Sequence, residues 1–446
     1  MTWIVLTIGL NPLPCLVEIY RLCKKIQAET GALPTFLPIR DRPRNREAER
    51  IRHYLNQRLT TEAGTPVSVN WEGRDQFLTD PHDPIATRRE ADVAARRIPV
   101  GAQAYFAFTG GTKVMSLETL AALQARGCNV TPAYLSASSH RVLSQESVNE
   151  DPGDERRHWN LPIPVLADLH RLKYQSTPSA DPSLEELSQR MLALLDDHHE
   201  RRWFWDWHKD VFKRSLGIGE TTMVERFNWP QKTIEWAGRN DHWRGVTELL
   251  VTAPVFGGAK VWNRTRGSWQ IQTNGSLRNY LVPLYKFLEN QFLEIYTWRT
   301  LRCLLPEQYA VEHSVTCASE KGKPFELDVV GVLGYQLLAI SCTYAASSKT
   351  CKQKGFEVIH RARQLGGDQA RAALVCLISE SERTLLEDDL SEELGLEGQV
   401  IRIFGANALR DVSLTHPTML KEQLREFLET DLQWKKLENT APIKTP

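Results

Sequence analysis

Short apolar runs alternate with helical patterns over roughly the first 145 residues. The run at 4–8 has the pattern of a buried strand, and the apolar residues from Cys15 to Ile26 recur three and four positions apart, as on one helix face. Gly31 stands just beyond the expected helix end. This alternation predicts βαβ units around a parallel sheet. Further strands are expected at 35–39, 67–71, 103–108 and 130–135, and helices near 44–59, 84–97 and 113–126.

The rest of the chain divides by its pattern into three parts. A polar connection is expected at 146–182, although its segment PIPVLADLHRL has the pattern of a packed strand and helix. A mostly helical middle domain is expected at 183–275, where six tryptophans cluster. Aromatic residues at such density indicate a core rather than a base-stacking surface. These tryptophans are Trp203, Trp205, Trp207, Trp229, Trp236 and Trp243.

The last part, 276–446, opens with a long helical pattern that is interrupted near Pro283. An order of helix, hairpin, helix and strand follows, which predicts an α/β or α+β core. The expected elements are strands at 326–333 and 336–342, a basic helix at 352–365, a strand in ALVCLIS, an acidic loop, a strand in QVIRIFG and an amphipathic C-terminal helix. The overall prediction is an α/β protein with two sheet-containing domains.

Composition narrows the function classes. Apolar residues make up 41% and charged residues 25% of the 446 residues, as in ordinary globular proteins. The apolar run at the N-terminus is too short to span a membrane, so a cytoplasmic protein is expected. Lys plus Arg and Asp plus Glu both number 55, so nucleic acid would have to bind local basic patches. The eight cysteines form no CxxC pair, which argues against a zinc site.

A glycine pair marks a candidate phosphate site. The segment FAFTGGTKVMS places Thr109, Gly110, Gly111, Thr112 and Lys113 between a strand and a helix. In a parallel sheet this turn lies at the carboxyl edge, where free N–H groups and the helix dipole attract phosphate. The alternative is a tight turn with no ligand. GxGxxG and GxxxxGK[ST] are both absent, so neither a dinucleotide cofactor nor a Walker-type nucleotide site is expected.

The TGGTKVMS turn, together with the short Asn-Pro loop after the first strand, resembles the CARF (CRISPR-associated Rossmann fold) domains over residues 1–145. The resemblance implies a sensor of cyclic oligoadenylate, most simply cyclic tetra-adenylate, in type III CRISPR antiviral defence. It also implies a homodimer whose two subunits form the ligand site together. The residues that match the ligand loops by position are Gly9, Asn11, Thr109, Gly110, Gly111, Thr112 and Lys113.

Two acids in the last part are candidates for a metal site. Glu326 and Asp328 stand at i and i+2 of one expected strand, so both side chains point to the same side. Two carboxylates beside an apolar strand are costly unless a cation joins them. The alternative is a solvated strand edge.

This layout resembles the PD-(D/E)xK, or restriction-endonuclease-like, nuclease fold over roughly 276–380. The resemblance makes Asp328 the first acid and expects an acid-x-lysine pair where Ser341 and Thr343 stand. Substitutes would be Glu294, Glu357 and a lysine, namely Lys349, Lys352 or Lys354. The catalytic set expected is therefore Asp328, Glu326, Glu357, Lys352 and Glu294, with Mg²⁺ or Mn²⁺ held by Asp328, Glu326 and Glu357.

The function expected is that of a metal-dependent endonuclease that cleaves RNA or DNA when a cyclic oligoadenylate binds. One alternative is a ligand-binding regulator or pseudonuclease, consistent with the altered residues at 341 and 343. Another is a HEPN-type ribonuclease, which needs an arginine and a histidine at close spacing. Loose matches to that motif are Arg202 with His208 and Arg410 with His416.

Overall fold

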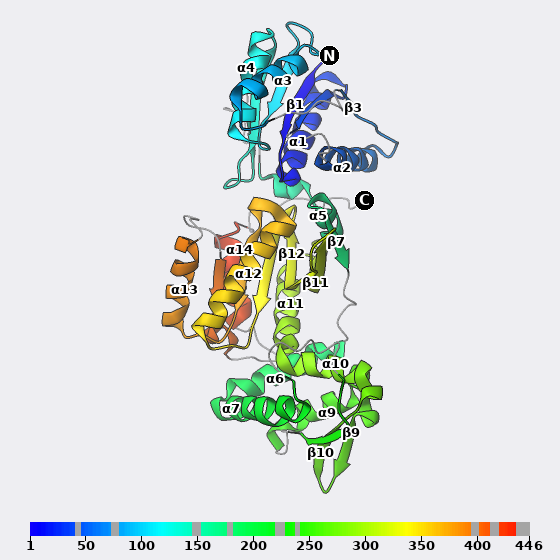
Figure 1. Ribbon diagram of the computed structural model, residues 1–446, viewed down its shortest axis with the longest axis vertical. Coiled ribbons are helices and arrows are strands. Elements are labelled where there is room, and N and C mark those ends of the chain that lie inside the picture. Colours follow the sequence, from blue (N-terminus) through cyan, green and yellow to red (C-terminus); the bar gives the residue numbers. More distant parts are fainter. Residues whose placement is uncertain are drawn as a thin grey trace.

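The computed structural model shows three regions stacked along one long axis (Figure 1). We call them the N-terminal domain, the C-terminal domain and the insertion, and the C-terminal domain lies between the other two. No helix in the described residues is long and apolar enough to cross a membrane. The structure describes residues 1–40, 46–72, 80–144, 153–175, 182–218, 228–236, 241–393, 401–410 and 419–433.

The N-terminal domain is a six-stranded sheet in the order β3-β2-β1-β4-β5-β6. All strands up to β5 are parallel, and β6 runs antiparallel to β5. The expected parallel sheet is confirmed, and its order is that of a doubly wound Rossmann-like fold. Its elements are β1 (Trp3–Ile8), α1 (Pro12–Thr30), β2 (Thr35–Arg40), α2 (Arg46–Ala63), β3 (Asn70–Trp71), α3 (Pro84–Ala95), β4 (Gln103–Ala107), α4 (Lys113–Ala125), β5 (Asn129–Leu135) and β6 (Val142–Ser144).

Helices cover both faces of this sheet, α1 and α2 on one side and α3 and α4 on the other. The chain leaves β1 toward β2 and leaves β4 toward β5, in opposite directions across the sheet. The strand order therefore reverses between β1 and β4. A crevice opens at such a switch point, outside the carboxyl ends of the two strands, and this is where ligands bind in open α/β sheets.

The C-terminal domain contains a second six-stranded sheet, in the order β15-β14-β13-β12-β11-β7. β13, β14 and β15 are parallel, whereas β12, β11 and β7 pair antiparallel. α11 packs on one face and α12 on the other. The elements are α5 (Ile163–Leu169), β7 (Leu172–Gln175), α10 (Arg278–Lys286), α11 (Phe292–Leu304), β11 (Val311–Ser319), β12 (Phe325–Leu333), β13 (Gln336–Cys342), α12 (Ser348–Gly366), β14 (Arg371–Val375), α13 (Glu380–Glu393), β15 (Ile401–Phe404) and α14 (Met419–Thr430).

Three parts of this domain differ from the expectation. The strand β11 was not expected. The expected acidic loop is the helix α13, because Leu386 and Leu390 recur four residues apart and are buried, while Glu380 and Glu382 lie in the first turn. The expected connection supplies β7, which extends the sheet beside β11. The rest of that connection, at 145–152 and 176–181, lies outside the described residues.

The insertion joins the C-terminal domain through α6, which packs against α11. Trp236 packs against Trp207 at 5.0 Å between ring centroids. Four of the six tryptophans are buried, which confirms the expected aromatic core for them, whereas Trp203 is exposed. The mostly helical expectation missed a three-stranded sheet in the order β8-β10-β9. The elements are α6 (Pro182–Asp196), α7 (His198–Asp206), α8 (Arg214–Leu216), β8 (Lys232–Glu235), α9 (Arg244–Thr252), β9 (Trp262–Thr265) and β10 (Ser268–Thr273).

The N-terminal and C-terminal domains share one apolar core. Residues of α1, such as Leu16 and Ile19, belong to the same buried cluster as Leu166 of α5 and Val358 of α12. Arg156, between the domains, is buried and donates to Gln336 Oε1 at 2.7 Å and to the Leu432 carbonyl at 2.8 Å. The joint between the two domains is therefore packed rather than loosely tethered.

Candidate functional site

The loops after β1 and β4 touch at the switch point of the N-terminal sheet. A Cβ at Gly9 would lie 2.8 Å from the Gly111 nitrogen, and one at Gly110 would lie 2.5 Å from the Thr7 carbonyl oxygen. Gly111 has a φ of +82°, a conformation that favours glycine. The Thr7 hydroxyl donates to the Gly110 carbonyl at 2.5 Å. Glycine is therefore required because two backbones meet at this point.

The two threonines of the turn are engaged within the protein. Thr109 Oγ1 accepts from the Leu135 backbone N–H at 2.7 Å, which ties the turn to β5. Thr112 caps α4, accepting from the Met115 N–H at 3.1 Å and donating to the Pro81 carbonyl at 2.7 Å. These hydroxyls position the loop, so the donors left for a ligand are mainly backbone groups and the ends of the helices.

These loops line a cavity of about 500 Å³, which we call the ligand pocket. α1 begins at Pro12 and α4 at Lys113, so the positive ends of two long helices lie beside it. Lys113 itself is exposed and is not among the lining residues. The lining residues are Gly9, Leu10, Asn11, Pro14, Pro81, His82, Thr109, Gly110, Gly111, Thr112, Met115, Leu135, Ala137, Asp368 and Gln369.

Several of these lining residues were not expected from the sequence, and three of them are polar. His82 precedes α3, whereas Asp368 and Gln369 come from the C-terminal domain, more than 250 residues away from the loops. No local pattern signals such a long-range approach. The ligand pocket is thus formed by two domains rather than by the Rossmann-like domain alone.

A buried acid lies directly beneath the turn. Glu18 of α1 is fully buried, and its Oε2 accepts from the Thr109 N–H at 3.3 Å. Burial raises the pKa of Glu18 to about 8, against the lowering effect of the hydrogen bonds from Thr109. The carboxyl group is therefore mostly neutral at pH 7, so it does not repel an anion bound above it.

The second predicted site lies in the C-terminal domain, where β12 and β13 face each other. Asp328 Oδ2 accepts from the Ser341 hydroxyl at 2.9 Å and from the Cys342 N–H at 2.6 Å. Ser341, which stands in the position of the expected acid, therefore holds Asp328 in place. Within the described part of the chain, Asp328 Oδ1 accepts no hydrogen bond, so this oxygen is open to a cation.

Glu294 of α11 is close enough to Asp328 for their charges to interact. Burial, followed by the negative charges of Asp328 and Glu326, raises the pKa of Glu294 well above its usual value. Burial also raises the pKa of Asp328, with a further contribution from Glu326. Glu326 itself is exposed. The charges of Glu294, Glu326 and Asp328 thus act on one another.

An asparagine missed by the sequence analysis supports Glu294. Asn290 Nδ2 donates to Glu294 Oε1 at 3.3 Å and to the Cys342 carbonyl at 2.7 Å, and Asn290 Oδ1 accepts from the Tyr344 N–H at 2.9 Å. Asn290 lies in a π-helical segment, Phe287–Gln291, that separates α10 from α11. π-helical segments inside helices are frequent at functional sites. Pro283 itself lies inside α10, so the helix is not interrupted there as expected. The change to a wider turn begins at Phe287, and this turn carries the residue that links α11 to β13.

Lys354 rather than Lys352 is the lysine whose charge lowers the pKa of both Glu294 and Asp328. Lys352 is held in ion pairs with Asp389 at 3.2 Å and Glu393 at 2.6 Å. We call Glu294, Glu326, Asp328 and Lys354 the acid cluster.

Glu357, an expected metal ligand, forms an ion pair with Lys354. It is exposed, and its Oε2 lies 3.6 Å from the Lys354 ammonium. Among the described residues, no three His, Cys, Asp or Glu side chains come together to hold a metal ion. The expected ligand set Asp328, Glu326 and Glu357 therefore does not form one metal-binding group in this structure.

The donors of the acid cluster nevertheless fit one class of metal. Mg²⁺ keeps several water molecules and is commonly bound through one or two carboxylates plus substrate phosphates, so it needs no three-residue cage. Asp328 and Glu294 supply such a pair, and their mutual repulsion would be relieved by a cation. Zinc, which takes three or four protein ligands, finds no such set within the described ranges.

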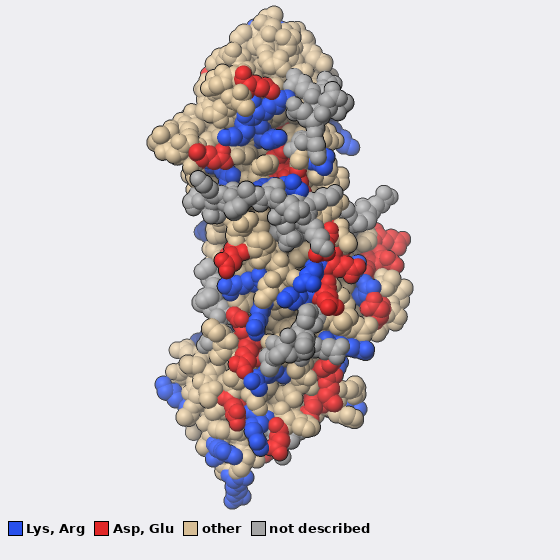
Figure 2. Space-filling model, turned by 180° about the vertical axis from the view of Figure 1, so that it is seen from behind, with Lys and Arg blue, Asp and Glu red and all other residues tan. Residues whose placement is uncertain are grey.

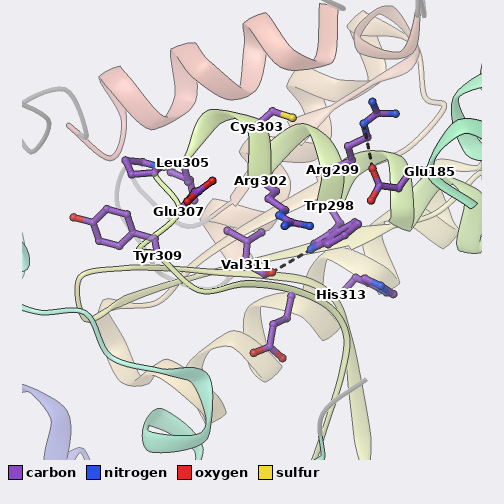
Figure 3. A pocket seen from close by; sticks show the side chains of 12 residues that line it. Glu185, Trp298, Arg299, Arg302, Cys303, Leu305, Glu307, Tyr309, Val311 and His313 are labelled. Atoms are coloured by element: carbon purple, nitrogen blue, oxygen red, sulfur yellow. Dashed lines mark hydrogen bonds and ion pairs between the residues drawn. The ribbon is translucent and has the colours of Figure 1, made fainter. Parts of the chain in front are cut away.

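A cavity larger than the ligand pocket contains none of the predicted site residues (Figure 3). It has a volume of about 970 Å³ and lies between α11 and β11. Its polar side chains bind one another: Arg299 pairs with Glu185 at 3.4 Å, and Trp298 Nε1 donates to the Val311 carbonyl at 3.1 Å. Arg302 lies over the Trp298 ring at 5.3 Å. Volume alone therefore does not identify the site.

Arg202 and His208, the first of the two arginine and histidine matches, do not form a ribonuclease site. Arg202 is exposed and lies 3.9 Å from Asp206, whereas His208 is buried among aromatic rings. Burial lowers the pKa of His208 to about 3, so it stays neutral. His416, the partner of Arg410, lies outside the described residues.

Charges of both signs lie side by side on much of one face of the molecule. Figure 2 shows Lys and Arg interspersed with Asp and Glu over the face turned toward the viewer. Arg361 lies over the Phe325 ring at 4.6 Å, and Arg371 donates to the Gln369 carbonyl at 3.2 Å. The basic side chains near the acid cluster are thus largely engaged within the protein.

Two solved structures resemble the chain over nearly its whole length. Protein VC1899 from Vibrio cholerae aligns with a TM-score of 0.60 at 14% identity, covering 96% of this chain and 98% of that one. Can2 from Sulfobacillus thermosulfidooxidans, solved in complex with cyclic tetra-adenylate, aligns with a TM-score of 0.56 at 13% identity, covering 97% and 99%. No protein-family model and no curated protein sequence matches the chain. The chain therefore has the α/β fold of these two proteins.

Proposed function

We propose that the chain is a cyclic-oligoadenylate-activated, Mg²⁺- or Mn²⁺-dependent endonuclease of type III CRISPR defence. The observation that carries the proposal is the ligand pocket, which lies at the switch point between β1 and β4 and beside two helix N-termini. A polyanion with nucleoside groups fits such a pocket. Can2, which shares the fold, binds cyclic tetra-adenylate.

The acid cluster supports phosphodiester cleavage. A divalent cation there would polarise the scissile phosphate and lower the pKa of the attacking water. Asp328 and Glu294 would hold the cation, and Asn290 fixes the Glu294 carboxylate by its hydrogen bond at 3.3 Å. Lys354 would stabilise negative charge on the phosphate in the transition state.

A homodimer is part of the proposal. Leu10, Ile85, Leu117 and Tyr134 of the N-terminal domain are large apolar side chains that are exposed in the single chain. The end of the molecule formed by this domain shows few charged residues in Figure 2. Exposed apolar patches on a folded domain are typical of protein interfaces. A second copy of this domain is the partner we propose.

The test is cleavage of fluorescent single-stranded RNA, single-stranded DNA and supercoiled plasmid. Each substrate is incubated with Mg²⁺ or Mn²⁺, with and without cyclic tetra- or hexa-adenylate. We expect cleavage that needs both the metal and the ligand and is abolished by EDTA. Cleavage that is indifferent to EDTA would overturn the metal mechanism.

The second candidate is a ligand-binding regulator without catalysis. Ser341 and Thr343 stand where the nuclease pattern has an acid and a lysine, and Ser341 donates to Asp328. If the protein binds cyclic tetra-adenylate in a calorimeter and cleaves none of the three substrates, this candidate replaces the nuclease.

A further inference from the structure

The turn that follows α12 reaches from the C-terminal domain into the ligand pocket. It comprises Gly367, Asp368 and Gln369. Gly367 has a φ of +69° and a ψ of −162°, a conformation that is essentially restricted to glycine. A Cβ there would lie 2.5 Å from Asn11 Oδ1, so the turn packs directly against the N-cap residue of α1.

Gln369 carries an unused hydrogen-bond acceptor at this place. Its side chain is 3% exposed, and no group in the described ranges donates to its buried Oε1. The backbone of the turn is fixed, because the Gln369 carbonyl accepts from Gln336 Nε2 at 3.1 Å and from Arg371 Nη1 at 3.2 Å. A buried acceptor without a donor costs about 1–3 kcal/mol. Its place in the pocket lining suggests that a ligand supplies the donor.

Asp368 adds a second acceptor beside the first. It is exposed, and its Oδ2 lies 3.5 Å from Asn11 Nδ2, which is a long and weak hydrogen bond. The Asn11 amide is positioned from the other side by His170, whose Nε2 lies 3.3 Å from Asn11 Oδ1. This side of the pocket therefore presents acceptors, and the negative charge of Asp368 disfavours a phosphate there.

The ligand pocket has two chemically distinct sides. The helix N-termini of the N-terminal domain favour phosphate, whereas the Asp368–Gln369 turn favours groups that donate hydrogen bonds. In an oligoadenylate, the donors are the adenine amino group and the ribose 2′-hydroxyl. We infer that Asp368 and Gln369 bind the nucleoside part of the ligand by accepting its hydrogen bonds, so both domains hold the ligand. This inference rests on the proposed function.

The consequence is a direct connection between the ligand and the acid cluster. The turn continues from α12, and Lys354 lies in the first half of that helix. A ligand that contacts the turn therefore contacts the segment that directly follows the helix carrying Lys354. Coupling of this kind is reciprocal, so a change in the turn alters both ligand affinity and the ligand concentration needed for cleavage.

The test measures cyclic tetra-adenylate affinity by calorimetry on the full chain. We expect Gln369→Leu and Asp368→Ala each to weaken binding about fivefold or more. Matched controls are Gln353→Leu on the exposed side of α12 and Asp388→Ala on α13, which should bind like the wild type. Folding is followed by thermal melting, and Gln369→Leu should melt no lower than the wild type because it removes an unpaired acceptor.

Two ligand analogues identify the donor. The inosine analogue lacks the adenine amino group, and the 2′-O-methyl analogue lacks the ribose hydroxyl donor. Each substitution should no longer weaken binding when the ligand is the analogue that lacks the group donating to the substituted residue. If both variants bind cyclic tetra-adenylate like the wild type, the inference is overturned while the sensor remains. If the wild type itself binds no cyclic oligoadenylate, the proposed function fails.

Discussion

The ligand pocket and the acid cluster were both expected from short sequence patterns, but they are built in different ways. At the pocket, the glycines of the pattern are the residues that make the geometry, because two backbones meet at Gly9 and Gly110. At the acid cluster, two positions of the pattern hold Ser341 and Thr343, and the site is assembled from α11, β12 and α12. A site made by backbone geometry tolerates little change, whereas a site made by side chains can be rebuilt from neighbouring elements.

The largest effect is expected from Asp328. Asp328→Asn keeps the shape of the side chain but removes the charge that would hold the cation, so cleavage should fall by about a thousandfold or more, equivalent to several kcal/mol. Gel assays with labelled RNA and DNA measure the rate, and calorimetry should show unchanged cyclic tetra-adenylate affinity. Asp389→Asn, on the exposed face of α13, is the control. Full activity in Asp328→Asn would show that the acid cluster is not the site of cleavage.

The second prediction separates two lysines on one helix. Lys354 lies near the acids, whereas Lys352 is paired with Asp389 and Glu393. Lys354→Ala should lower the cleavage rate by about a hundredfold, since it removes a charge that stabilises the transition state. Lys352→Ala loses only surface ion pairs and should change the rate less than about twofold. The reverse ranking, measured at saturating metal and ligand, would return the catalytic role to Lys352.

The same contrast explains what the sequence could predict. The strands and helices of the N-terminal domain apart from β6 were expected because their apolar residues follow simple periods, and the turn at Gly110 follows from them. Asn290 and Lys354 were not distinguished because nothing in a helical run marks a π-helical segment or tells which of three lysines carries the charge that acts on the acids. Asp368 and Gln369 enter the ligand pocket only through tertiary packing of two domains. Local patterns reveal local sites, and long-range packing decides the rest.

The third prediction concerns Glu18, the buried acid under the turn. Because its pKa is raised to about 8 in the folded state, from about 4.5 when unfolded, its contribution to stability is fully present below about pH 4.5 and is lost as the pH rises through about 8. Glu18→Gln mimics the neutral acid and does not titrate. The melting temperature of this variant relative to that of the wild type should therefore rise by a few degrees between pH 6 and pH 9. Glu29→Gln, at an exposed position of the same helix, should show no such trend. A melting difference that does not vary with pH would mean that Glu18 does not titrate in this range.

The last prediction compares two glycines, one required by the close approach of two loops and the other only by its backbone conformation. A Cβ at Gly110 would lie 2.4 Å from Cys15 Sγ and 2.5 Å from the Thr7 carbonyl oxygen, so the turn must move. Gly110→Ala should therefore cost about 1–3 kcal/mol of stability and weaken cyclic tetra-adenylate binding about tenfold. Gly31 has a φ of +71° but meets no atom within 4 Å, so Gly31→Ala should cost about 1 kcal/mol and leave binding unchanged. Urea unfolding and calorimetry on both variants measure the two effects separately. If both variants bind cyclic tetra-adenylate equally well, the close approach of the two loops does not shape the pocket. The explanation of this site by backbone geometry would then be wrong.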